Sequence, residues 1–147
     1  MAAVQRGART GLRYVTALFL LGIVVQFFLV GLGLFGMSAG ATIDNAHSLN
    51  AHRDFGWILS EFGGGLLLVL TLLAWPKPPR ILGLYVLLVV LAFPVQPVLA
   101  SSGVHHRFVG MLHPVNALLL LGLSGYLTRC AWATRRSEAP ASVPATG

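Results

Sequence analysis

Residues 14–35 read YVTALFLLGIVVQFFLVGLGLF, a stretch that contains no charged side chain. About 20 consecutive apolar residues are enough for an α-helix to cross the roughly 30 Å hydrocarbon core of a bilayer. Three further stretches meet this requirement, at residues 55–75, 81–99 and 108–132. The sequence therefore predicts an all-α membrane protein whose transmembrane domain, residues 14–132, is a bundle of four helices.

The composition agrees with lipid as the main solvent of this chain. Of its 147 residues, 56% are hydrophobic and only 10% are charged, whereas soluble domains carry about 25% charged residues. Such a chain has too little polar surface to cover itself in water. Cys130 is the only cysteine, which excludes an intrachain disulfide and a CxxC metal motif.

The Lys and Arg residues indicate how the helices are oriented in the membrane. Eight of the ten flank one set of helix ends: Arg6, Arg9, Arg13, Lys77, Arg80, Arg129, Arg135 and Arg136. Because basic residues concentrate in cytoplasmic loops, we expect an up-down-up-down bundle in the plasma membrane with both termini in the cytoplasm. The net charge of +6 then reflects topology, and no nucleic-acid partner is expected.

The two ends of the chain carry separate predictions. A basic segment before an apolar stretch is also typical of a signal peptide, but the apolar part of a signal peptide has only about 7–15 residues. We therefore expect residues 1–13 to form a basic cytoplasmic N-terminus before a retained first helix. Residues 133–147 are rich in small and polar residues and proline, and we predict a disordered cytoplasmic tail there.

The five histidines all fall in the half of the membrane opposite the basic ends: His47, His52, His105, His106 and His113. Those in loops are expected to be solvated. His52 opens the second helix, either as an ordinary interfacial residue or as a ligand. His113 lies inside the fourth helix if this begins near Phe108, and at its end if it begins at Pro114. An ionisable residue inside the apolar layer indicates a functional site.

Two histidines on different helices near one membrane face suggest the axial ligands of a b-type haem. A flat porphyrin needs small neighbours, and Gly56, Gly110 and Ala117 share the helix faces of the two histidines. The helix lengths place these histidines about 6 Å apart in depth, a difference that helix tilt can absorb. His106 is the alternative ligand, because Gly110 follows it by four residues as Gly56 follows His52.

Three polar residues inside the spans complete the set of candidates: Glu61, Gln26 and Gln96. Glu61 is the only charged residue of its apolar stretch and should face the interior of the bundle. One interpretation is structural, with a hydrogen bond to Ser60, Gln26 or Gln96. The other is a proton-relay carboxylate or a partner for a cation.

Several of these residues resemble one four-helix half of heme A synthase. They are Gln26 and Gly33, His52-Arg53 at the head of the second helix, Gln96, and Leu112-His113 with Ala117, all within residues 26–129. The stretches AHR (51–53) and LHPVNA (112–117) also resemble a family of small four-helix membrane proteins. The resemblance to the synthase implies that histidines on alternate helices face a haem. This chain has one half rather than two, and Leu49 where that family has Glu, so haem binding is implied more than oxidation of a haem methyl group.

Two functions of different classes follow from these observations. In the first, His52 and His113 bind haem b in a small cytochrome-like or haem-handling protein. In the second, the chain is a cofactor-free scaffold or accessory subunit whose Gly-rich faces contact partner helices or a second copy. No residue emerges as catalytic, and enzymatic activity is left open.

Overall fold

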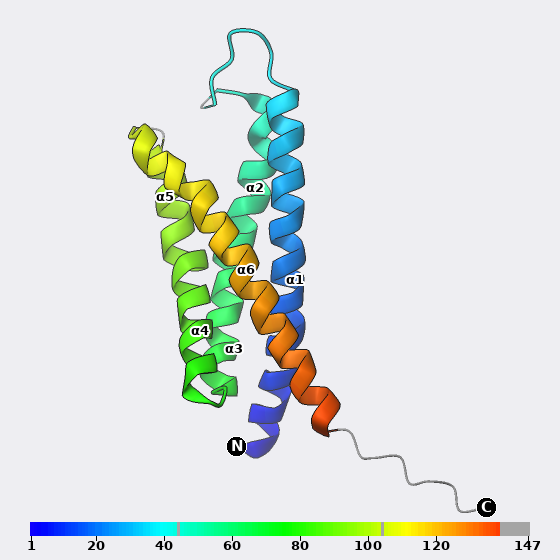
Figure 1. Ribbon diagram of the computed structural model, residues 1–147. Helices are drawn as coiled ribbons and strands as arrows, with labels where there is room; N and C mark the ends of the chain where they lie inside the picture. The colour runs from blue at the N-terminus through cyan, green and yellow to red at the C-terminus, as the bar shows by residue number, and fades with distance from the viewer. Residues whose placement is uncertain (44, 104, 139–147) are drawn as a thin grey trace, which may run out of the picture.

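The computed structural model describes residues 1–43, 45–103 and 105–138, which form a helical bundle (Figure 1). Four helical spans are long and apolar enough to cross a membrane: Ala2–Phe35, His47–Ala74, Pro79–Gly103 and Arg107–Ala133. Successive spans run in opposite directions in Figure 1. For the described residues, the prediction of an all-α chain with four helices long and apolar enough to span a membrane is confirmed. The side of the membrane that each end occupies stays a prediction.

The first and last spans are single long helices. α1 covers Ala2–Phe35, so the basic segment before the apolar stretch is itself helical. α6 covers Arg107–Glu138 and crosses the other helices obliquely (Figure 1). It extends into the segment for which the sequence predicts a disordered tail, and residues 139–147 of that segment lie outside the described residues.

The two middle spans are each interrupted by a π-helical turn. The second span consists of η1 (His47–Leu49), α2 (Asn50–Ile58), the π-turn η2 (Leu59–Gly63) and α3 (Gly64–Ala74). The third span consists of α4 (Pro79–Val90), the π-turn η3 (Leu91–Val95) and α5 (Gln96–Gly103). Pro94 lies inside η3 and lacks the N–H that an α-helical ladder needs. The α-helical ladder of this span is therefore interrupted at Pro94 by a π-turn.

The α3–α4 turn lies next to the N-terminal part of α1. α3 ends at Ala74, followed by Trp75 in a left-handed conformation, and Pro79 begins α4. Both Arg9 Nε and Gln5 Nε2 donate hydrogen bonds to the carbonyl oxygen of Ala74, at 3.2 and 3.3 Å. The last carbonyls of a helix have no partner within it, so these two side chains of α1 cap α3.

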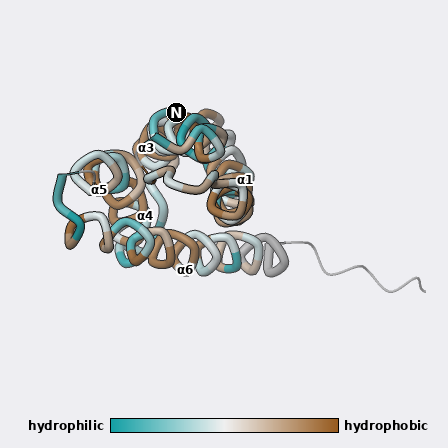
Figure 2. The backbone as a smooth tube through the Cα atoms, turned by 90° about the horizontal axis from the view of Figure 1, so that it is seen from above, coloured by the Kyte–Doolittle hydropathy of each residue, from teal (hydrophilic) through white to brown (hydrophobic). Residues whose placement is uncertain are grey.

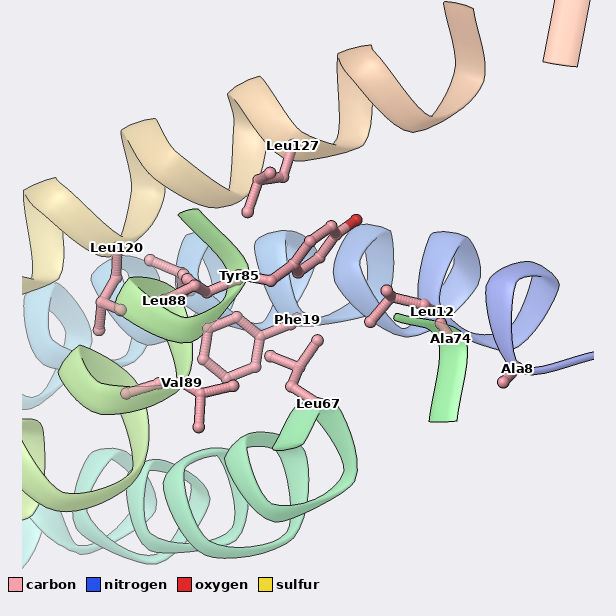
Figure 3. Close-up of a cluster of buried hydrophobic side chains, with 12 residues drawn as sticks. Ala8, Leu12, Phe19, Leu67, Ala74, Tyr85, Leu88, Val89, Leu120 and Leu127 are labelled. Atoms are coloured by element: carbon pink, nitrogen blue, oxygen red, sulfur yellow. The ribbon is translucent and has the colours of Figure 1, made fainter. Parts of the chain in front are cut away.

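The core draws residues from all four spans (Figure 3). Phe19 of α1, Leu67 of α3, Leu88 of α4 and Leu127 of α6 are buried among one another. Two hydroxyls in this core bond to carbonyls of their own helices, Thr16 Oγ1 to Leu12 O and Ser124 Oγ to Leu120 O, both at 2.6 Å. Many large apolar side chains of the spans are exposed, and the end-on view in Figure 2 shows how much of the backbone belongs to hydrophobic residues. An apolar exterior fits a bundle that lipid surrounds.

Candidate histidine site between the second and fourth spans

His52 of α2 and His113 of α6 face each other across the bundle. Their ring centroids are 6.3 Å apart and their ring planes are nearly perpendicular, at 87°. Both side chains are half-buried. Because α6 begins at Arg107, His113 lies inside the helix rather than at its end. The two rings thus lie close together despite the difference in depth that the helix lengths alone imply.

A chain of side-chain amides holds the His113 segment. Gln96 Nε2 lies 3.5 Å from His113 Nε2 and donates to the His113 carbonyl oxygen at 3.4 Å. Asn116, which is 4% exposed, donates through Nδ2 to Gln96 Oε1 at 2.6 Å and to the carbonyl of Leu91 at 3.0 Å. That carbonyl belongs to the π-turn η3. The proline-containing turn of the third span is thereby tied to the helix that carries His113.

The His52 segment is held from α1. Gln26 Nε2 donates to the carbonyl oxygen of His52 at 3.1 Å. A Cβ atom on Gly56, one turn further along α2, would collide with the same Gln26 amide nitrogen. Glycine at position 56 thus gives the Gln26 side chain the room it needs to reach the backbone of α2.

Three polar atoms around the histidine pair are buried without a hydrogen-bond partner in the described part of the chain. They are Nδ1 of His52, Nδ1 of His113 and Oε1 of Gln26. Leaving such an atom unpaired costs about 1–3 kcal/mol, so a cluster of them is unusual. A metal-binding imidazole uses one nitrogen for the metal and the other for a hydrogen bond. Beside His113, the donor nitrogen of the Gln96 amide lies near Nε2 and no partner contacts Nδ1. A metal at one ring nitrogen would require a hydrogen-bond acceptor at the other.

The other predicted site residues lie apart from this pair or contact protein. His106 precedes α6 and is exposed, as are His47 and His105. Gly110 packs against Gly103 of α5, where a Cβ on Gly103 would lie 2.7 Å from the Cα of Gly110. Ala117 is half-buried on α6. The role of Gly56, Gly110 and Ala117 in lining a haem stays a prediction.

Glu61 lies in the π-turn η2 and is partly exposed. Its predicted partners Gln26 and Gln96 hydrogen-bond to the segments that carry the two histidines. Neither interpretation of Glu61 is tested by these contacts, and both stay predictions.

Asn116 is the residue that sequence reasoning missed. It occurs three residues after His113, which places it near the same helix face. An amide at this spacing from an intramembrane histidine was the available signal. Its partners, however, come from another span and cannot be read from the local sequence.

Within residues 1–43, 45–103 and 105–138, no group of three or more His, Cys, Asp or Glu side chains has the arrangement of a metal site. No family model, curated protein or solved structure matches this chain. Fold and site together define its class as a membrane protein of four apolar helical spans with a histidine pair between the second and fourth.

Proposed function

We propose that this protein binds a b-type haem between His52 and His113. The supporting observation is the 6.3 Å separation of the two crossed imidazole rings. Imidazole binds first-row metals at about 2.0–2.1 Å, so a metal held between two such rings separates the ring centres by roughly 6 Å. The donor set and its spacing therefore fit an iron with two axial histidines.

A haem fits this pair better than a bare ion. Structural metal ions take about four protein ligands, whereas the site offers two imidazoles. A porphyrin brings its own four equatorial nitrogens, and its iron supplies one-electron redox chemistry when bound. The protein's part is to hold the iron through the two rings and to orient His113 through Gln96 and Asn116.

The expected orientation puts the site near the extracytoplasmic face of the plasma membrane. This rests on the eight basic residues at the opposite helix ends. A cytochrome-like or haem-handling role at that face follows from the ligand pair. The resemblance to one half of heme A synthase supports the same assignment.

The alternative is a cofactor-free scaffold or accessory subunit. Its support comes from glycines that meet no other group, since a Cβ on Gly31, Gly65, Gly83 or Gly122 would have nothing within 4 Å. Small residues on an outer surface let a partner helix, or a second copy of the chain, approach closely in lipid.

An optical spectrum of the purified protein separates the two proposals. A reduced-minus-oxidised difference spectrum with the sharp bands of a six-coordinate, low-spin haem is expected for the haem proposal. The scaffold predicts no such bands, even after expression with added haem. That absence would remove the haem proposal and leave the scaffold.

A further inference from the structure

The end of the bundle that carries the N-terminus has a hollow of about 160 Å³ between α1 and α6. Thr10, Arg13 and Tyr14 of α1 and Trp132 of α6 line it. The rings of Tyr14 and Trp132 meet edge to face, with centroids 5.5 Å apart. Tyr and Trp gather at the level of lipid headgroups. The hollow therefore lies where the apolar spans meet the water phase.

The lining of this hollow has the chemistry of a phosphate site. The Arg13 guanidinium and the Thr10 hydroxyl are both donors to phosphate oxygens. Further positive charge lies at this end of the bundle, on Arg6, Arg80 and Arg129. The carboxylates whose side chains the structure describes, Asp54 and Glu61, belong to α2 and η2 further along the bundle. The basic side chains at this end therefore attract an anion in the hollow, and neither described carboxylate lies at this end to repel it.

We propose that this hollow binds the headgroup of an anionic phospholipid such as phosphatidylglycerol. Basic pockets between transmembrane helices are known to hold such headgroups. A lipid is favoured over a soluble anion because apolar surface continues directly from the hollow along α1. Leu18 and Leu21 there are 64% and 57% exposed, so acyl chains can lie against them while the phosphate rests beside Arg13. This site is independent of the histidine pair.

Native mass spectrometry of the full chain in detergent tests the proposal. The protein is equilibrated with equal amounts of phosphatidylglycerol and phosphatidylcholine that carry the same acyl chains. We expect preferential retention of phosphatidylglycerol, a several-fold lower bound fraction for Arg13→Gln, and a smaller loss for Thr10→Val. Lys77→Gln is the matched control, because it removes one charge from the same end in the exposed turn between α3 and α4. It should bind like the unmodified protein.

Three outcomes would overturn the lipid site. Equal losses in Arg13→Gln and Lys77→Gln would assign the binding to diffuse surface charge. Equal retention of phosphatidylcholine would show that the headgroup is not recognised. Displacement of the lipid by glycerol phosphate at a similar concentration would identify a soluble anion as the ligand. The apparent unfolding temperature of each variant is measured alongside, and Thr10→Val carries the test if Arg13→Gln does not fold.

Discussion

At the scale of single residues, the proposed site depends on two glutamines that hold the segments carrying the histidines. Gln26 bonds to the backbone that carries His52, and Gln96 contacts His113 at both its ring and its carbonyl. Each histidine is thus fixed from a neighbouring span rather than by its own helix. A metal ligand needs such outer contacts to keep its ring in one orientation.

Gly56→Ala tests the first of these contacts. The added methyl group occupies the position of the Gln26 amide nitrogen, so the hydrogen bond to His52 O should be lost. Relative to Gly65→Ala, which shares the helix-propensity gain of replacing glycine, we expect stability to be lower by about 1 kcal/mol, the typical contribution of one hydrogen bond, seen as a lower apparent unfolding temperature in detergent. Gly65→Ala is the control in the same span, because nothing lies within 4 Å of its Cβ position. Equal destabilisation by both variants would contradict the account of Gly56.

The two candidate ligands could be predicted from the sequence, but the residues that hold them in place could not. His52 and His113 stand out because ionisable residues are rare in apolar stretches. Asn116 stands out less, because its spacing from His113 is the only signal in the sequence and its partners are not local. Those partners, Gln96 and the carbonyl of Leu91, are 20 and 25 residues away in the chain.

At the scale of elements, hydropathy predicted the four spans but not their internal form. A window of apolar residues has the same hydropathy whether it is α-helical or contains a π-turn. Pro94 predicts that the α-helical hydrogen-bond pattern is interrupted. The form of the interruption, however, depends on which groups bond to the carbonyls that are left without a helical partner. Here Asn116 of α6 donates to the carbonyl of Leu91 within η3. The starting point of α6 was likewise open between two positions, and the structure places it at Arg107.

Arg9→Ala tests the contact between α1 and the end of α3. The guanidinium caps the carbonyl of Ala74 at the negative end of the α3 dipole. Its removal should lower stability by about 1 kcal/mol, measured by thermal unfolding in detergent. Arg6→Ala is the control, since Arg6 is an exposed residue of the same helix. If both variants unfold at the temperature of the unmodified protein, the cap does not contribute.

At the scale of the whole molecule, charge and polarity divide the bundle into two ends. One end carries the terminal arginines and the α3–α4 turn, and the other carries all five histidines. The sequence alone predicted this division, because it depends only on the order of the spans. It places the proposed lipid site and the proposed haem site at opposite membrane faces.

Reporter fusions test the orientation of the bundle. A reporter that is active only outside the cytoplasm should work when fused after Ala41 or Ser102, and should stay silent after Lys77 or Gly147. The reason is that Lys and Arg residues concentrate at the helix ends next to Lys77 and the C-terminus. The opposite pattern would invert the bundle, and activity after Gly147 in addition to Ala41 would mean an odd number of spans and contradict the four-helix arrangement.

The most direct measurement for the central claim is the optical spectrum of single histidine variants. Replacing His52 or His113 by Ala should remove the low-spin haem bands, because one remaining imidazole leaves the iron five-coordinate. His106→Ala should keep those bands, since this side chain is exposed and lies outside the pair. Low-spin bands that survive His113→Ala but vanish with His106→Ala would contradict the assigned pair, and a wild-type protein without haem would contradict the claim itself.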